Sequence, residues 1–303
     1  MLKRTAALVL ALGPLLAGPA PAASLQERLG HPASARLLII HADDLGMSHS
    51  VNRATLEALE QGLISSASIL VPCPWFPEVV RWARAHPQAD LGIHLALTSE
   101  WTSFRWRPLS AAASVPSLLD ADGYFPLVEM TVGQRARPEE AERELRAQVE
   151  AARAAGIAIT HLDSHMNSLY QSAGLMEVYR RLARDYKVPL RWDRTMRPPA
   201  GAEITPAEVL LDGIVAVNPG VDPKAWRATY EGLLAPLPPG AYMMVLHLAY
   251  ADEEMWGATG DHPDWGAAWR RYDLDLVRSP EFRRFLKDQG FVIVTWKDLA
   301  KAL

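Results

Sequence analysis

The sequence predicts an α/β fold, a single domain with the architecture of a (β/α) barrel. Three observations lead to this prediction. The chain of 303 residues is 49 % hydrophobic, enough for one large core. From residue 36 to the end at residue 303, short apolar runs alternate with amphipathic stretches, as in parallel sheets. About seven such units suit a barrel better than two domains.

The apolar runs and the amphipathic stretches define the expected elements in chain order. We expect strands at Leu37–Ile40, Ser66–Val71, Leu91–Leu97, Ile157–Leu162, Pro189–Trp192, Tyr242–Leu248 and Phe291–Thr295. We expect helices at Ser50–Glu60, Trp75–Ala85, Pro138–Ala155, Leu175–Tyr186, Ala207–Leu211, Lys224–Leu234, Pro280–Gln289 and Lys297–Ala302. An open doubly wound sheet is the alternative, but the turn after the first strand is Asp-Asp-Leu-Gly, which would repel a phosphate.

The N-terminus has the composition of a cleaved signal peptide. Residues 1–22 contain a basic start, an apolar run and the small-residue pattern Ala20-Pro21-Ala22. We therefore expect export to the periplasm or the medium, with no stable membrane anchor. Without Lys3 and Arg4 the net charge falls by two, from −4 to −6, which argues against nucleic acid as a partner.

Cysteine use narrows the chemistry further. Cys73 is the only cysteine, so the chain forms no internal disulfide and no zinc site made of thiolates. The sequence does not decide whether the protein forms a homo-oligomer.

Ionisable side chains gather where the expected strands end. In barrels of this kind the working residues lie at the C-terminal ends of the strands. Four such ends carry histidine or aspartate, including five of the nine histidines: His41, Asp43, Asp44, His94, His161, Asp163, His165 and His247. One histidine in a strand is usually a hydrogen-bonded core residue, but four strand ends of this kind together indicate a site.

Aspartate and histidine without cysteine suit a divalent metal ion. Three protein ligands with a water in the open position form the usual catalytic arrangement, and the ion makes that water easier to deprotonate. The adjacent Asp43 and Asp44 fit this chemistry, because one can bind the cation while the other deprotonates the attacking water. A histidine from another strand can supply the acid. The pattern predicts metal-assisted hydrolysis.

Three motifs resemble those of the YdjC-like (ChbG family) carbohydrate deacetylases, which are related to polysaccharide deacetylases. They are His-Ala-Asp-Asp-Leu-Gly at 41–46, Gly-Ile-His-Leu-Ala-Leu-Thr at 92–98 and Thr-His-Leu-Asp-Ser-His at 160–165. The resemblance implies a single-domain distorted (β/α) barrel like those of glycoside hydrolases and deacetylases. It also implies a hydrolase that removes N-acetyl groups from amino sugars such as chitin oligosaccharides. It implies one divalent metal ion, Mg²⁺ in the family, while the ligand set also suits Zn²⁺.

The same resemblance assigns roles to single residues. Asp44, His94 and His165 would bind the metal, Asp43 would be the base and His247 the acid. Arg191 would steer the base or the substrate. His161 is a second choice for the place of His165, and Asp163 would hold a ligand imidazole.

The sequence departs from the family pattern at His41, where an asparagine is usual, and in the residues after His165 and His247. Because of these departures, the sequence does not decide which sugar is the substrate or which residue is the general acid. Two other functions stay open as well: an O-acetyl esterase or amidase on the same metal scaffold, and an inactive glycan-binding relative. Trp101, Trp106, Trp256 and Trp265 lie in expected loops, where they would either stack on sugar rings or pack beneath the loops.

Overall fold

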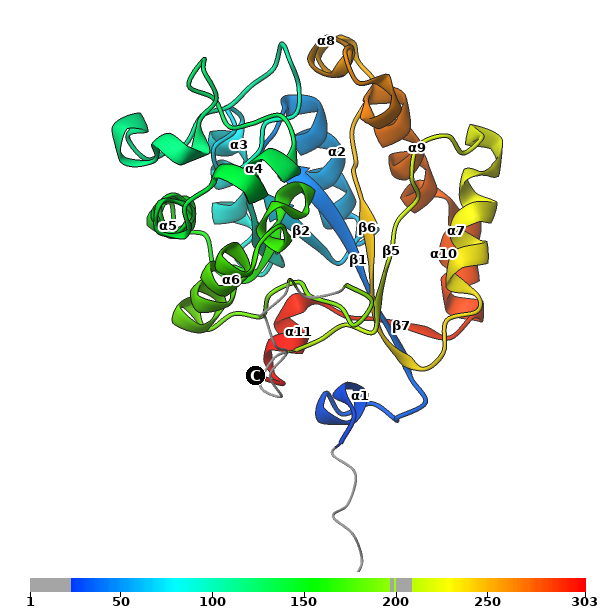
Figure 1. Cartoon of the computed structure of the whole chain (residues 1–303). Helices are drawn as coiled ribbons and strands as arrows, with labels where there is room; N and C mark the ends of the chain where they lie inside the picture. Colours follow the sequence, from blue (N-terminus) through cyan, green and yellow to red (C-terminus); the bar gives the residue numbers. More distant parts are fainter. Residues whose placement is uncertain (1–22, 197–198, 200–208) are drawn as a thin grey trace, which may run out of the picture.

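The computed structural model describes residues 23–196, 199 and 209–303 (Figure 1). The expected signal peptide, residues 1–22, lies outside the described residues. The strands are β1 (Arg36–Leu45), β2 (Ser66–Ile69), β3 (Leu91–Leu95), β4 (Ile159–Ser164), β5 (Gly213–Val215), β6 (Gly240–Leu246) and β7 (Phe291–Ile293). The α-helices are α1 (Leu25–Arg28), α2 (His49–Glu60), α3 (Phe76–Ala85), α4 (Glu129–Arg135), α5 (Pro138–Ala154), α6 (Ala173–Tyr186), α7 (Trp226–Leu234), α8 (Glu253–Thr259), α9 (Ala267–Arg278), α10 (Pro280–Asp288) and α11 (Trp296–Ala300).

All the strand pairs are parallel, in the order β4-β3-β2-β1-β6-β5, with β7 paired to the first residues of β1. The two edges meet through the segment 189–194. Leu190 bridges to Leu162 of β4, and Asp193 bridges to Leu211 just before β5. The sheet therefore closes into a distorted barrel, as the sequence predicted, with a seam of single bridges in place of a full strand.

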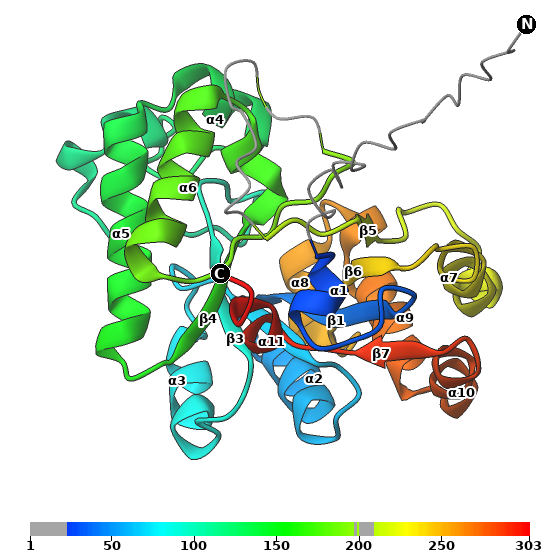
Figure 2. The same ribbon diagram turned by 90° about the horizontal axis from the view of Figure 1, so that it is seen from below.

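Two apolar clusters fill the fold, one on each side of the strands. Inside the lower barrel, Leu37 and Ile39 of β1 pack with Met243 of β6 and with Trp296 of α11. Figure 2 shows α11 within the ring of strands and the long helices outside it. The outward-facing residues of the strands, such as Leu38 and Ile40, join the larger cluster with the surrounding helices. Because side chains alternate along a strand, β1 continues its inward row above Ile39 with His41.

The helix boundaries follow ordinary capping rules. Ser48, Ser172 and Ser279 each accept a hydrogen bond from the backbone of the first turn of α2, α6 and α10. Proline opens α5 and two glutamates lie in its first turn. The expected positions of these helices are confirmed to within two residues.

Several expectations about elements were wrong. The first strand does not stop at Ile40 but runs to Leu45. Residues 209–211 are not helical and Leu211 forms a β-bridge, while the rest of the expected helix 207–211 lies outside the described residues. The short strand β5 and the helices α8 and α9 were not expected. Across the described ranges, no helix is both long and apolar enough to span a bilayer.

Candidate metal and catalytic site

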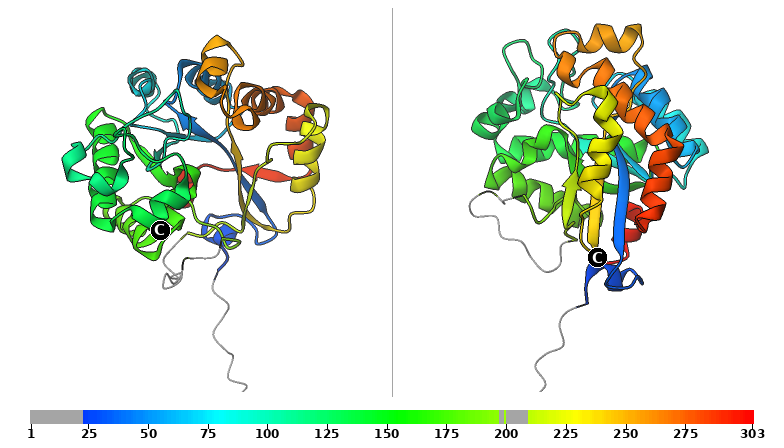
Figure 3. Two further views of the ribbon diagram at one scale, coloured as in Figure 1. Left: turned by 45° about the horizontal axis from the view of Figure 1, so that its top comes forward. Right: turned by 90° about the vertical axis from the view of Figure 1, so that its right-hand side faces the viewer.

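A β-bulge in β1 brings the two adjacent aspartates to one side of the sheet. Ala42 pairs with Ala67 and Leu45 with Ile69, so β1 has one residue more than β2 in this interval. Asp44 adopts a left-handed backbone conformation with φ 67°, which places Asp43 and Asp44 near one another. Gly46 follows with φ 100°, and its N–H donates to Oδ1 of Asn52 at 2.7 Å. Both carboxylates are buried. The upper end of the barrel, where they lie, faces forward in the left view of Figure 3.

Asp44, His94 and His165 come together although they lie on three different strands or strand ends. One ligand atom from each lies within 4.8 Å of the other two. Oδ1 of Asp44 is 3.5 Å from Nε2 of His94 and 3.8 Å from Nε2 of His165. All three side chains are buried. The sequence prediction named these three residues as one set, and the structure brings that set together.

Hydrogen bonds on the far side of each imidazole aim the Nε2 atoms at Asp44. Nδ1 of His94 lies 2.6 Å from Oδ1 of Asp163, so this nitrogen donates to the carboxylate. Nδ1 of His165 lies 3.0 Å from the hydroxyl of Thr98. Such partners fix the orientation and tautomer of metal-binding histidines. Asp163 therefore lies where the sequence analysis expected a residue that holds a ligand imidazole.

Arg270 of α9 pairs with the other carboxylate oxygen of Asp44. Its guanidinium lies 2.8 Å from Oδ2, and both side chains are buried. Burial alone would raise the pKa of Asp44, but Arg270 and the nearby histidines outweigh it and hold that pKa well below its usual value. The arginine thus fixes one oxygen and leaves Oδ1 turned towards the two histidines.

The donor set fits a divalent cation. Oδ1 of Asp44 is buried and has no hydrogen-bond donor among the described residues. It faces the Nε2 atoms of two histidines whose Nδ1 atoms have other hydrogen-bond partners, so each Nε2 can bind a cation once it carries no proton. An unpaired buried carboxylate oxygen is costly unless a positive charge meets it. One carboxylate and two imidazoles are donors that zinc and similar transition metals accept.

Asp43 lies beside this set without belonging to it. Oδ2 of Asp43 is 3.8 Å from Nε2 of His94 and 3.9 Å from Nε2 of His247, and Oδ1 is 3.1 Å from Nε2 of His41. Burial would raise the pKa of Asp43, but the neighbouring histidines outweigh it and lower that pKa. The carboxylate is therefore ionised at neutral pH and able to accept a proton.

His247 follows β6 and is more exposed than the other site histidines. Its backbone N–H donates to Oδ2 of Asp273 at 2.9 Å, and its ring packs 4.9 Å from the ring of Trp269. Trp269 in turn contacts the half-exposed Trp265, with 4.9 Å between ring centroids. Burial lowers the pKa of His247 to about 4, although Asp44 and Asp43 act in the opposite direction. His247 is therefore neutral in the resting protein.

Two further residues predicted for the site, His161 and Arg191, lie outside the set of Asp44, His94 and His165. His161 stacks on Trp296 inside the barrel, and its Nε2 presses against Gly92, where even a Cβ would come within 2.3 Å. The ligand atoms of His161 group with those of His41 and Asp163, whereas those of His165 group with Asp44 and His94. Arg191 is buried, donates to Oδ1 of Asn167, and interacts electrostatically with Asp43 and Asp163.

Sequence reasoning missed several residues of the site. Arg270 lies in a helix that was not expected, and so does Asp273. Glu100, with Oε1 3.4 Å from Nε2 of His165, lies two residues after the second motif and could have been found as part of the same strand end. Of the four tryptophans expected in loops, Trp101 and Trp106 are buried and pack beneath the loops. Trp256, which lies in α8, and Trp265 are exposed.

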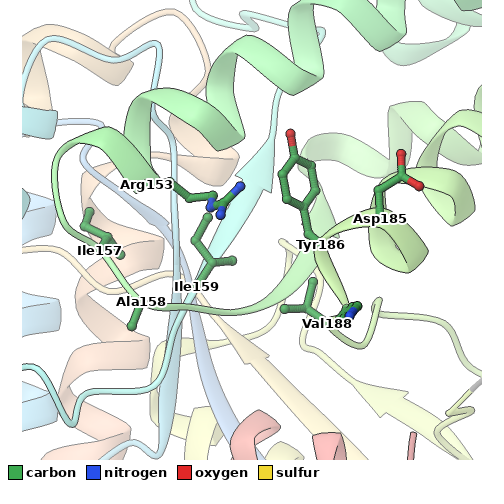
Figure 4. Close-up of a pocket in the computed structure, with 8 residues that line it drawn as sticks. Arg153, Ile157, Ala158, Ile159, Asp185, Tyr186 and Val188 are labelled. Carbon is green, nitrogen blue, oxygen red and sulfur yellow. The ribbon is translucent and has the colours of Figure 1, made fainter.

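A hollow of about 340 Å³ lies at the opposite end of β4 and is separate from this site. Arg153, Ile157, Ile159 and Tyr186 line it, between the ends of α5 and α6 (Figure 4). Arg153 lies over the ring of Tyr186, 5.4 Å from its centroid.

Comparison with known proteins identifies the family. The model described as YdjC-like protein matches residues 37–288. The chain belongs to the YdjC-like family. The resemblance expected from the three motifs is thereby confirmed.

Two proteins similar to this chain are named carbohydrate deacetylase. The one from Thermus thermophilus is 37 % identical over 286 residues, which are 92 % of this chain and 99 % of the relative. The one from Brevibacillus brevis is 39 % identical over 265 residues, 86 % of this chain and 99 % of the relative. Both names agree with the enzyme class that the sequence predicted.

A crystal structure from Enterococcus faecalis shares the fold. It belongs to a protein whose name refers to cellobiose-phosphate cleavage, and it superposes with a TM-score of 0.74 at 24 % identity, over 88 % of this chain and 99 % of that one. The predicted α/β barrel architecture is confirmed.

Proposed function

We propose that this YdjC-like protein is a metal-dependent carbohydrate deacetylase that hydrolyses the N-acetyl groups of amino sugars or their oligosaccharides. The observation that carries the proposal is the unpaired, buried Oδ1 of Asp44 facing Nε2 of His94 and of His165, with Asp43 beside it. The names of the relatives support the substrate class.

The metal would be held by Asp44, His94 and His165. When bound, a divalent cation polarises the acetyl carbonyl and makes a water easier to deprotonate. Zn²⁺ suits two imidazoles and one carboxylate, and Mg²⁺ is the ion that the family resemblance suggests.

Asp43 is the proposed base. Water attacks the acetyl carbon, and its proton passes to Oδ2 of Asp43, the oxygen that faces His94 and His247. The carbon–nitrogen bond then breaks, and the amine nitrogen of the sugar takes up a proton.

His247 is the proposed donor of that second proton, which it has to obtain during the reaction. Its lowered pKa leaves it neutral beforehand. Asp43 is the only carboxylate within 4 Å of its Nε2 among the described residues, with Oδ2 at 3.9 Å. The proton taken from water by Asp43 therefore has a short route to the leaving nitrogen.

Trp265 supplies the proposed contact with the sugar ring. It is half-exposed and continues, through Trp269, the row of rings that starts at His247. An indole face is a suitable platform for the apolar face of a pyranose.

We also propose that the enzyme works outside the cytoplasm, because residues 1–22 have the composition of a signal peptide. Mass spectrometry of the mature protein from the periplasm or the medium tests this. A full-length chain found in the cytoplasm would contradict it.

The function is tested by acetate release. The protein is stripped of metal, reloaded with Zn²⁺ or Mg²⁺, and incubated with N-acetylated and O-acetylated oligosaccharides. We expect acetate from the N-acetylated substrates only with metal present. Release from O-acetylated substrates alone would assign the protein as an esterase, and metal binding without release from either would assign it as a glycan-binding relative.

A further inference from the structure

His41 lies inside the barrel between two carboxylates. Its Nε2 is 3.1 Å from Oδ1 of Asp43, 3.2 Å from Oδ2 of Asp163 and 3.1 Å from the hydroxyl of Ser68. The ring is completely buried. Neither of the two carboxylate oxygens has a hydrogen-bond partner among the described residues, so both meet His41 at ion-pair distance, while Ser68 meets the geometry of a hydrogen bond with Nε2. Two anionic oxygens this close to one nitrogen are tolerable only if that nitrogen carries a proton.

The other ring nitrogen also meets an acceptor. Nδ1 of His41 lies 3.0 Å from Oγ of Ser66, and the Ser66 hydroxyl donates to Oδ1 of Asp90 at 2.7 Å. The second oxygen of Asp90 accepts the backbone N–H of Lys297 at 2.8 Å, as a carboxylate does. Because a serine hydroxyl has one hydrogen, Oγ of Ser66 accepts from Nδ1. Both nitrogens of His41 are then donors, and the ring is an imidazolium.

We propose that His41 is a positioning residue that, as a buried imidazolium, holds the base Asp43 and the metal-site carboxylate Asp163 on one donor. This inference rests on the function proposed above, since it assigns the support of the base in that reaction. A continuous path of contacts results, in which Asp43, His41, Asp163 and His94 follow one another with separations of 3.1, 3.2 and 2.6 Å.

The arrangement explains how the barrel interior accommodates so many acids. Asp43, Asp163 and Asp90 surround His41 directly or through one hydroxyl, and all three are buried. A cation at their centre offsets part of their mutual repulsion. Burial alone would lower the pKa of His41, but the hydrogen bonds and charges of Asp163 and Asp43 raise it.

Residue 41 is also a position at which this chain differs from the family motif that it resembles, because the motif usually has an asparagine there. An asparagine amide can donate to one carboxylate, but it carries no charge and does not span two acids and a serine in the same way. His41→Asn is therefore an informative substitution, because it restores the usual residue and removes only the charge and the ring.

The first test reads the protonation of His41 directly. Nitrogen NMR of the zinc-loaded protein with labelled histidine, compared with His41→Asn to assign the ring, should show both nitrogens of His41 protonated at pH 8. A neutral tautomer would overturn the proposal. This measurement does not depend on turnover, so it stands apart from the test of the deacetylase activity.

The second test separates positioning from folding. We expect His41→Asn and His41→Gln to lower kcat tenfold to hundredfold, with KM and zinc content close to the wild type, as for other outer partners of metal sites. His86→Asn, at the partly exposed end of α3, serves as the control and should leave kcat unchanged. If the wild type releases acetate and His41→Asn does so at an equal rate with full zinc content, His41 does not position the base.

Discussion

Nδ1 of His94 and Oδ1 of Asp163 lie 2.6 Å apart, and this hydrogen bond determines which nitrogen of His94 faces Asp44. The pair comes from neighbouring strands, because His94 of β3 and Asp163 of β4 are in register. A second bulge precedes Asp163: the interval Leu91–Ile93 of β3 pairs with Ile159–Leu162 of β4. The bulge adds one residue to β4 and so decides which residues of the Thr-His-Leu-Asp-Ser-His motif lie beside His94.

Asp163→Asn should weaken metal binding tenfold to hundredfold, because the amide provides a neutral acceptor in place of the carboxylate that orients His94. Calorimetric titration of the metal-free protein with Zn²⁺ measures the change. Asp185→Asn, on the exposed end of α6, is the matched control. Equal affinities for Asp163→Asn and the wild type would show that Asp163 does not orient the ligand.

Metal binding should depend on pH through His94. Burial alone would lower the pKa of His94, but Asp163 and Asp43 outweigh it and raise that pKa to about 9 in the metal-free protein. Below this pH the ring must lose a proton before Nε2 can bind a cation. The affinity should therefore rise with pH up to about 9 and level off above it.

Calorimetry in two buffers of different ionisation enthalpy checks the pH effect by counting released protons. About one proton should be released at pH 7 and fewer at pH 10. Proton release that does not change between these pH values would contradict the assignment to His94.

Asp43→Asn should keep the metal and lose turnover, with kcat falling roughly hundredfold to ten-thousandfold, as expected for loss of a general base. His165→Ala should lose both metal and turnover. Metal content by elemental analysis and acetate release by enzymatic assay separate the two variants. A normal rate for Asp43→Asn on every good substrate would refute the base assignment.

Arg270→Met should destabilise the metal-free protein more than the metal-loaded one. Breaking the buried pair leaves Asp44 without its cation, which costs about 3–5 kcal/mol of unfolding free energy. A bound metal replaces part of that positive charge. Urea unfolding with and without Zn²⁺ measures both values.

The neighbouring Arg271→Met is the matched control, because Arg271 forms an exposed pair with Asp275 and should change stability by less than about 1 kcal/mol. An equal loss for Arg270→Met with and without metal would mean that the arginine and the cation do not act on the same carboxylate.

Trp265→Ala should raise KM several-fold for oligosaccharides and leave kcat unchanged, since stacking binds the ground state and the transition state alike. Initial rates over a range of substrate concentrations provide both constants. Trp82→Ala, on α3, is the control, because Trp82 stacks on His86 and has no contact with the site histidines. A lower kcat at constant KM would place Trp265 in the chemical step instead.

The sequence was most informative where a pattern is local. Strands with continuous apolar runs, such as Leu37–Ile40, and helices with caps, such as Pro138–Ala154, could be predicted from a few residues. The Asp and His residues at strand ends could be predicted as one site, because parallel strands bring their carboxyl ends to the same face.

Features that depend on pairing across the chain were not predictable in this way. Arg270 reaches Asp44 from 226 positions along the chain, and no local pattern marks it as a partner. The two bulges change the direction of side chains without any glycine or proline at the extra residue. Closure through the segment 189–194 depends on single bridges, which have no sequence signature of their own.

The bulge in β1 has a consequence for Asp43 and Asp44 themselves. The two side chains are chemically identical, yet only Asp44 lies within 4 Å of both His94 and His165. What separates them is backbone geometry, because only Asp44 has the left-handed conformation with φ 67°. In a straight strand they would point to opposite faces, one of them into the helix layer. A single backbone dihedral angle thus separates the carboxylate proposed to bind the metal from the carboxylate proposed to be the base.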